Sequence, residues 1–469
     1  MDIAAIALSL LLPWGLGVAV LAALDWPTRH GDAGGVALRA GFAYIVGAIL
    51  LTLWMRVLSA AGIGFSRAAI GAPVLVAATG LMFWAARNGR ISRAEFGVAL
   101  SALFRPTLER WHNVVWIAII AWLAVHFALM AAEIAWRPLY PWDAWVQWAT
   151  KARVWYELGR IVPFVHAEQW LAGAGNAYYD ASPNYPATVP LLQVWTCVAI
   201  GRWDDSAMNW PWLAMLIALT LALYGALRGE GIAPLTALFG AYFLATLPLV
   251  DVHVALAGYA DLPMGAVYGL AAIAFYRWAV RRNARDAIVT IFLALACPMI
   301  KNPGGIWALT LVPGVMVVLM PRRGLKVAGV CFALGILAFL LIARAKPTLL
   351  GYHLDLDFNP AWQQLIKSYY LMGNWNLLWY AVIALIAFGW RRLVEPPLAP
   401  LTAVAAAGFI FLGMVFSFTS AASWIFDLTT ANRASMHLAP LLVFMGVLTW
   451  QRLTEPLATA APAAAPGTP

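Results

Sequence analysis

The chain has 469 residues, of which 63% are hydrophobic and only 11% are charged, and its mean hydropathy is +0.78. This composition excludes a soluble globular protein, because too few polar side chains remain to keep its surface wet. The formal net charge of +9 comes mostly from arginine. In a membrane protein a surplus of basic residues usually marks the cytoplasmic loops rather than a binding surface for a polyanion. We therefore expect no nucleic-acid-binding role.

Apolar runs of roughly 17 to 23 residues recur along almost the whole chain, and a helix of that length crosses about 30 Å of hydrocarbon. The sequence therefore predicts an all-α polytopic membrane protein of about 13 transmembrane helices, because helices satisfy their own backbone hydrogen bonds in lipid. The first run, Ile3 to Leu24, has no basic segment before it and is expected to remain as a helix. Three helices in 1–112 should precede a core in 113–452, and the Ala/Pro-rich tail 453–469 should be disordered.

Basic clusters predict which loops face the cytoplasm. The four clusters are Arg87, Arg90 and Arg93 with Arg105 and Arg110; Arg277, Arg281, Arg282 and Arg285; Arg322, Arg323 and Lys326; and Arg391 with Arg392. They can share one side only if Ala187 to Ile200 does not cross, so this short segment is expected to be re-entrant or interfacial. The N-terminus is then outside and the C-terminus inside.

The predicted outer loop, residues 135–189, is too long to be a mere connector. It contains "WDAWVQWATKARVWYELGR", in which Trp145, Trp148 and Ala152 recur at helical spacing. This pattern predicts an amphipathic helix that lies on the membrane surface and guides a lipid headgroup toward the bundle. Lys151 and Arg153 are expected to face headgroups.

Two aspartates on the predicted outer side each have two interpretations. Asp143 begins the amphipathic helix, where it is either an N-cap or a general base at the water-facing mouth of the bundle. Asp261, in "GYADLP", either caps the following helix or orients an acceptor or a cation. The sequence alone leaves these alternatives open.

Two cations on the same predicted side stand at breaks between apolar runs. Lys301 lies in "MIKNPGG" and Arg433 in "TTANRASMH". A cation at such a break is costly unless it is paired or functional, although interfacial snorkelling is the alternative for each. A phosphate would be gripped bidentately by the arginine and met as a point charge by the lysine.

The remaining candidates for chemistry carry weaker signals. The histidines on the predicted outer side show no metal-ligand spacing and read as hydrogen-bonded bystanders, and the acidic triplet "DLD" reads as a solvated turn. The three cysteines read as small buried hydrophobes. These residues are His253, His353 and His437; Asp355 to Asp357; and Cys197, Cys297 and Cys331. No nucleotide-binding glycine pattern stands in a suitable context, and no cofactor or metal is indicated.

The predicted order of elements in this chain is an outer-loop acid, surface helices, "SPNYPATVPLL" (Ser182 to Leu192) and then "GYADLP". This order resembles that of the GT-C superfamily of polyprenyl-phosphate-sugar-dependent glycosyltransferases. That superfamily includes protein O-mannosyltransferases and lipid A aminoarabinose transferases. The resemblance covers roughly Val114 to Trp450 as an order of elements. It implies that Asp143 is catalytic and that Tyr185-Pro186 and Asp261 match later family elements. Many members carry two adjacent acids, whereas Asp143 is followed by Ala144.

The resemblance implies a GT-C-like bundle that acts as an inverting glycosyltransferase. The sugar would pass from a polyprenyl-monophosphate donor to a glycan, lipid or protein acceptor on the periplasmic face of a bacterial inner membrane. Lys301 and Arg433 would bind the donor phosphate, and the acceptor or sugar would be positioned by Asp261, Trp142, Trp145 and Tyr185. The alternatives are a lipid or small-solute transporter or flippase, and an accessory subunit of an envelope-assembly complex. The absence of an inverted repeat and the gathering of charges at one face favour the enzyme.

Overall fold

The computed structural model describes residues 2–27, 33–91, 97, 108–173, 177–349, 352–354 and 361–454. Within these residues eight helices are long and apolar enough to cross a membrane, or nine if one bent pair counts as a single span. The protein is therefore an all-α, multi-pass membrane protein, as its composition predicts. The predicted total of about 13 spans is not confirmed, because several apolar stretches form helices that are short, bent or broken.

The N-terminal part of the structure packs its helices closely against the core. Its elements are α1 (Ile3–Ala23), α2 (Ala33–Ala60), the π-helical turn η1 (Arg67–Gly71) and α3 (Ala72–Arg87). A Cβ atom built on Gly47 of α2 would lie 1.7 Å from the carbonyl oxygen of Pro13 on α1, so only glycine allows this approach. Small residues at helix contacts are typical of membrane bundles, where packing rather than water exclusion holds helices together.

The centre of the molecule is α12, in which every residue from Asp261 to Arg277 is buried. The helices of this central part are α5 (Arg110–Trp136), α9 (Trp210–Gly229), α10 (Pro234–Ala245), α11 (Pro248–Ala255), α12 (Asp261–Arg281) and α13 (Ala284–Ile300). The helices α10 and α11 meet at an angle of 57°. Pro248 accounts for the break, since proline cannot continue a helical hydrogen-bond ladder.

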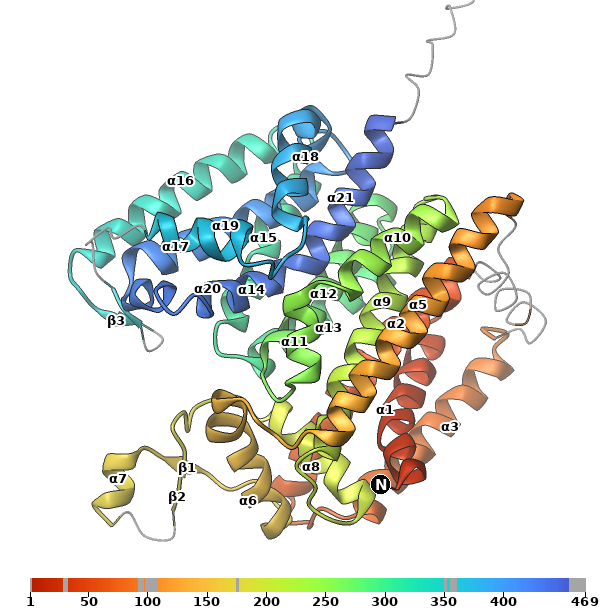
Figure 1. Cartoon of the computed structure of the whole chain (residues 1–469), viewed down its shortest axis with the longest axis vertical. Helices are drawn as coiled ribbons and strands as arrows, with labels where there is room; N and C mark the ends of the chain where they lie inside the picture. Colours follow the sequence, from red (N-terminus) through yellow and green to blue (C-terminus); the bar gives the residue numbers. More distant parts are fainter. Residues whose placement is uncertain are drawn as a thin grey trace, which may run out of the picture.

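The long loop after α5 folds into its own layer at one end of the molecule (Figure 1). It contains η2 (Ala144–Ala149), α6 (Thr150–Leu158), β1 (Phe164–Val165), α7 (Ala167–Leu171), β2 (Tyr178–Tyr179), α8 (Thr188–Ile200) and η3 (Ala207–Asn209). The two strands pair in parallel, with Phe164 opposite Tyr178. The 13 residues of α8 extend only about 20 Å, too short to cross a bilayer, and all are buried within the protein rather than lying at an interface.

The C-terminal part supplies the remaining wall of the bundle. Its elements are α14 (Gly304–Leu309), α15 (Leu311–Leu319), α16 (Gly324–Ala343), β3 (Thr348–Leu349), β4 (Tyr352–His353), α17 (Trp362–Ile366), η4 (Lys367–Leu371), α18 (Leu378–Leu393), α19 (Ala399–Phe418), η5 (Ser420–Ile425), α20 (Thr430–Ser435), η6 (Met436–Leu438) and α21 (Ala439–Thr454). The strands β3 and β4 are antiparallel. Cys331 on the peripheral helix α16 is exposed, so the expectation that all three cysteines are buried is wrong for this one.

A buried ion pair fastens the N-terminal part to the core at the end of α12 far from Asp261. The Asp286 carboxylate accepts hydrogen bonds from Arg277 Nε at 2.9 Å and from Trp26 Nε1 at 2.7 Å. The guanidinium of Arg277 also lies over the Trp26 ring, 5.3 Å from its centroid. Residues of three different segments are thereby joined in one buried network.

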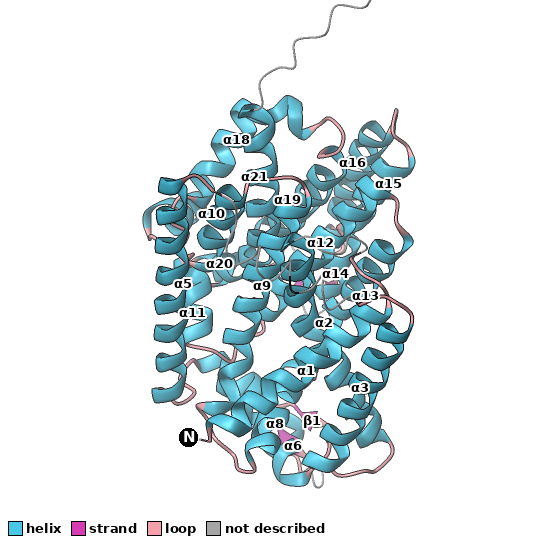
Figure 2. Ribbon diagram, turned by 90° about the vertical axis from the view of Figure 1, so that its right-hand side faces the viewer, coloured by secondary structure: helices cyan, strands magenta, loops and turns pink. Residues whose placement is uncertain are grey.

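The two ends of the described chain lie at opposite ends of the molecule. The beginning of α1 is near the loop layer, whereas α21 ends at the other extreme of the long axis (Figure 1; Figure 2). The sides of the membrane that the two termini face stay a prediction. The predicted tail 453–469 lies almost entirely outside the described residues, as do Arg93, Arg105 and Asp355 to Asp357.

Candidate active site

A cavity of about 530 Å³ opens between the loop layer and the C-terminal part of the bundle. Its walls come from η2, the beginning of α12, the break between α13 and α14, α19, η5 and α20 with η6. The volume falls in the range of about 300 to 1,000 Å³ that is typical of small-molecule sites. The four charged residues singled out from the sequence, Asp143, Asp261, Lys301 and Arg433, all line it.

Asp261 is the buried centre of this charged group. It is fully buried, and its Oδ1 accepts a hydrogen bond from Lys301 Nζ at 2.5 Å. Its Oδ2 accepts two from Arg433, from Nε at 3.0 Å and from NH2 at 2.9 Å. The carboxylate therefore pairs with the two cations and does not cap α12, although Asp261 is the first residue of that helix.

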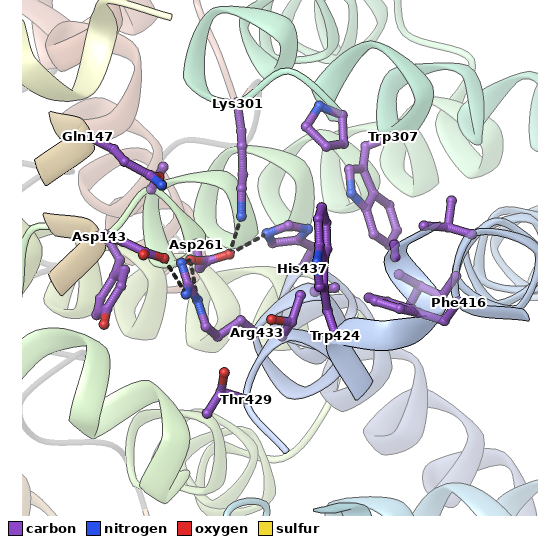
Figure 3. A pocket seen from close by; sticks show the side chains of 18 of the residues that line it. Asp143, Gln147, Asp261, Lys301, Trp307, Phe416, Trp424, Thr429, Arg433 and His437 are labelled. Atoms are coloured by element: carbon purple, nitrogen blue, oxygen red, sulfur yellow. Dashed lines mark hydrogen bonds and ion pairs between the residues drawn. The ribbon is translucent and has the colours of Figure 1, made fainter. Parts of the chain in front are cut away.

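Asp143 is joined to the same arginine from the other side. Its Oδ2 accepts a hydrogen bond from Arg433 NH1 at 2.6 Å, and its side chain remains 27% exposed. The Asp143 carboxylate makes no cap hydrogen bond to η2, so the capping interpretation does not describe this structure. Arg433 thus bridges two carboxylates, one buried and one open to the cavity (Figure 3).

The position of Arg433 follows from the local sequence around α20. Asp427 Oδ1 accepts from the backbone N–H groups of Thr429 at 2.7 Å and Thr430 at 3.0 Å, which secures the beginning of this short helix. Burial alone would raise the pKa of Asp427, but these hydrogen bonds together lower it. In the middle of α20, Asn432 Oδ1 accepts from Trp375 Nε1 at 2.8 Å. The beginning and the middle of α20 are therefore anchored.

Lys301 reaches the cavity because the helical run stops there. Its backbone is extended (φ −150°, ψ 144°) between the end of α13 and the beginning of α14. The sequence "KNPGG" explains the stop, since proline and glycine both disfavour a continuing helix. A Cβ atom on Gly304 would lie 2.1 Å from the Cys297 carbonyl oxygen, so the chain can fold back here only with glycine.

The segment "GYADLP" packs directly against the beginning of η2. Gly258 has φ +105°, and a Cβ atom there would lie 2.7 Å from the Cβ of Ala144. Ala144 is fully buried at this contact. Tyr259 follows Gly258, and its backbone carbonyl accepts a hydrogen bond from Trp212 Nε1 at 2.8 Å. The centroid of its ring lies 4.3 Å from the Arg433 guanidinium carbon. Tyr259 thus adds a cation–π contact that helps to hold Arg433.

Tyr185 also lines the cavity, with its ring 5.0 Å from that of Trp148. Burial raises the pKa of Tyr185, so its phenol is neutral at physiological pH. Lys151 and Asp180 hold this part of the loop in place. Their side chains are 1% and 0% exposed and meet at 2.6 Å, and Lys151 Nζ also donates to the Ser182 carbonyl at 2.8 Å.

The expectation that Lys151 faces lipid headgroups is therefore wrong. The side chain turns inward because Asp180 offers it a buried partner, and its pKa is lowered by burial, which the Asp180 carboxylate partly offsets. Arg153, two residues later, is half-exposed and pairs with Glu157 at 2.7 Å.

The structure does not bring Trp142 and Trp145 into the cavity. Trp142 is 67% exposed, and the two rings contact each other edge-on at 5.2 Å. Trp145 instead lines a separate surface cleft. The cause is the winding of η2, which turns Asp143, Gln147 and Trp148 toward the cavity and the residues between them away.

His437 lines the cavity but has no signal in the sequence as a ligand-binding residue. It is 2% exposed, and its Nε2 lies 3.6 Å from Asp261 Oδ1. Tyr259, Gln147 and Trp307 are further lining residues that sequence reasoning did not select. Of these three, Tyr259 could have been selected from the sequence, because it lies two positions before Asp261 in the segment "GYADLP".

The charged group has spare capacity to bind an anion. Two carboxylates balance two cations formally, yet the described contacts use one of three Lys301 N–H groups and three of five on Arg433. The opposite side of the cavity is apolar and includes Trp307, Phe416 and Trp424 (Figure 3). A molecule with an anionic head and a hydrocarbon tail matches both sides.

The described residues contain no group of three or more His, Cys, Asp or Glu side chains arranged to hold a metal ion. Comparison with protein-family models, curated proteins and solved structures finds no match to this chain. The fold defines the class, a multi-pass α-helical membrane protein, and any more particular function has to be inferred from the cavity itself.

Proposed function

We propose that this protein is an inverting glycosyltransferase that moves a sugar from a polyprenyl-monophosphate donor to a hydroxyl group of a cell-envelope acceptor. One observation carries the proposal: four charged residues from distant parts of the chain, Asp143, Asp261, Lys301 and Arg433, meet in one cavity that is apolar on its other side. This arrangement supports an amphiphilic donor, since the cations suit a phosphate and the aromatic wall suits its lipid.

Lys301 and Arg433 bind the donor phosphate in this proposal. Both can do so without losing Asp261, because each has N–H groups left over. Asp261 holds the two cations side by side from a buried position, so the positive charge is already oriented before the donor arrives. Such preorganised charge stabilises a transition state in which the leaving phosphate gains negative charge.

Asp143 is the general base. It accepts the proton of the acceptor hydroxyl while that oxygen forms a bond to the anomeric carbon. The bond from the anomeric carbon to the phosphate oxygen breaks, and the polyprenyl phosphate leaves with the bonding electron pair. One displacement inverts the configuration at this carbon, and no energy source beyond the donor is required.

The bond between Arg433 and Asp143 has to be exchanged during this cycle. Arg433 NH1 donates to Asp143 at 2.6 Å. A donor phosphate competes for the same guanidinium and leaves the Asp143 carboxylate available to the acceptor hydroxyl. We therefore expect the donor to bind before the acceptor.

The proposed setting is the periplasmic face of a bacterial inner membrane, with the loop layer outside. The support is the arginine distribution in the sequence, which assigns the opposite ends of the helices to the cytoplasm. The lipid donor then reaches the cavity from the outer leaflet.

Transfer of radiolabelled sugar from polyprenyl-monophosphate donors tests the proposal, with wild type compared with Asp143→Asn in membranes. We expect the variant to lose transfer by a factor of about 10² to 10⁴, the usual effect of removing a general base. Glu157→Gln is the matched control, because Glu157 is an exposed acid of the same loop that pairs only with Arg153 in the described contacts. Full transfer by Asp143→Asn would remove Asp143 as the base. A wild type that uses no such donor but moves lipid across the bilayer would be a flippase.

A further inference from the structure

His437 is a buried polar group to which the described residues offer no hydrogen-bond partner. It lies in η6, between α20 and α21, and is 2% exposed. Among the described residues neither of its ring nitrogens has a hydrogen-bond partner. Its nearest acidic oxygen, Asp261 Oδ1, is 3.6 Å away, beyond hydrogen-bond distance. A buried imidazole without partners is unfavourable, and such groups in native proteins call for an explanation.

The ring is held in a defined orientation at the edge of the cavity. It meets the Trp307 ring edge-on, with centroids 5.3 Å apart and an interplanar angle of 87°. Trp307 is itself buried and packs against Phe411. The imidazole is thus fixed by packing, although no described residue lies within hydrogen-bond distance of its nitrogens.

His437 stands where the charged side of the cavity meets the aromatic side. Asp261 and Lys301 lie on one side of it, and Trp307 and Phe416 lie on the other (Figure 3). The ring approaches the same Asp261 oxygen that binds Lys301. A ligand atom beside His437 is therefore also beside a cation, at the beginning of an apolar wall.

The position favours one kind of ligand atom. A neutral imidazole has one N–H donor and one acceptor, and the neighbouring Lys301 selects for a negatively charged acceptor. In an amphiphile, the anionic atoms closest to the hydrocarbon are the phosphate oxygens next to the first lipid carbon. A metal ion fits less well, because the described residues offer no third ligand there.

We propose that His437 donates a hydrogen bond to a phosphate oxygen of the lipid donor and so marks the junction between phosphate and lipid. The proposal rests on the proposed function and extends it by fixing the direction of the donor. The lipid runs past Trp307, Phe416 and Trp424, and the sugar points toward Asp143 and Gln147. His437 is a donor-binding residue here and transfers no proton.

Binding of farnesyl phosphate to the detergent-solubilised full chain tests this role, with farnesol as the matched ligand that lacks the phosphate. We expect His437→Leu to weaken farnesyl phosphate binding about tenfold and to leave farnesol binding unchanged. His437→Gln, which keeps an N–H donor, should restore most of the affinity. A merely structural role would not separate the two ligands and would not be rescued by glutamine.

His253→Leu is the matched control, because His253 is also buried and also has an unused ring nitrogen, but it does not line the cavity. It should bind farnesyl phosphate like the wild type. Equal affinity of wild type and His437→Leu for farnesyl phosphate would overturn the inference while leaving the proposed function intact. Failure of the wild type itself to bind farnesyl phosphate would instead overturn the proposed lipid-phosphate donor and this inference with it.

A spectroscopic measurement does not depend on the leucine variant folding. The ring ¹⁵N signals of His437, assigned by their loss in His437→Gln, should move when farnesyl phosphate is added and should not move with farnesol. Signals that stay in place on phosphate binding would also overturn the inference.

Discussion

At the scale of single residues, Arg433 decides how the site is built. It contacts both aspartates through separate nitrogens, with Asp261 at Nε and NH2 and Asp143 at NH1. A planar guanidinium can make this bridge because its N–H groups point in several fixed directions, whereas an ammonium is a point charge. The identity of the cation therefore matters as much as its charge.

Arg433→Lys should lose sugar transfer by about 10² to 10³ although the charge is kept, because one ammonium cannot hold Asp261 and a phosphate as the guanidinium does. Transfer rates at saturating donor measure the effect. Arg153→Lys is the control, since Arg153 forms an exposed pair with Glu157 and should keep full activity. Wild-type rates in Arg433→Lys would show that only charge is needed at this position.

The residue after Asp143 also has a physical explanation. Family members that the sequence resembles often carry a second acid there, but Ala144 is fully buried against Gly258. A carboxylate would have neither space nor a partner at this contact. In this chain Asp143 therefore has no neighbouring acid, and Asp261 supplies the second carboxylate of the site from another element.

At the scale of elements, the charged residues of the candidate site lie at the ends or breaks of helices rather than in the middle of long helices. Asp143 precedes a π-helical turn, Lys301 separates two helices and Arg433 sits in a helix of six residues. Such breaks free side chains and backbone from the regular pattern of the bundle. Close packing between these short elements then sets their positions.

Gly258→Ala tests this packing. The substitution places a Cβ atom 2.7 Å from Ala144 on a backbone with φ +105°, so it should displace η2 and destabilise the protein by about 1 to 3 kcal/mol. The thermal unfolding temperature in detergent and the rate of sugar transfer should both decrease. Gly80→Ala is the control, because Gly80 lies within α3 with nothing within 4 Å of a new Cβ atom. Identical behaviour of the two variants would refute the proposed contact.

A double-mutant cycle tests the buried pair that holds the Tyr185 segment. Lys151→Met and Asp180→Leu each leave one buried charge unpaired, so each should cost about 3 to 5 kcal/mol of unfolding free energy. The double variant should be less destabilised than the sum of the two, because neither charge remains. Additive effects, measured by chemical denaturation in detergent, would mean that the pair contributes nothing as a pair.

At the scale of the whole molecule, the site lies between the loop layer and the C-terminal part of the bundle, at the beginning of the central helix α12. The Arg277–Asp286 pair with Trp26 lies toward the other end of α12, where the sequence predicts the cytoplasm. The molecule thus carries one charged group toward each end of its buried central helix, the candidate site at one and a buried ion pair at the other. The orientation of the protein is therefore defined by whether the Asp261 end or the Arg277 end of α12 faces the periplasm.

Cysteine labelling in spheroplasts measures that orientation. In a Cys331→Ser background, Glu157→Cys should react with a membrane-impermeant maleimide from outside, and Arg391→Cys should react only after permeabilisation. Cys197 and Cys297 are buried and should stay unlabelled, which provides the internal control. The reverse pattern would place the candidate site on the cytoplasmic side and would contradict the proposed periplasmic activity.

The sequence by itself determined the class of protein and much of the charged group. Apolar length and the scarcity of charge require membrane helices, and a charge retained at a break in such a chain marks a place where it is needed. These are local properties, so Asp143, Asp261, Lys301 and Arg433 could be selected one at a time. The predicted count of about 13 spans is not confirmed, because hydropathy does not register where an apolar stretch is bent or broken.

Only the tertiary structure decided which side chains meet. It turned Lys151 inward to Asp180, turned Trp142 and Trp145 away from the cavity, and brought His437 beside Asp261. These outcomes depend on the winding of η2 and on contacts between residues far apart in the chain, for which a single sequence has no local pattern. A lone histidine in an apolar run looks the same whether its nitrogens are satisfied or not, and its burial without a partner became visible only once its neighbours were in place.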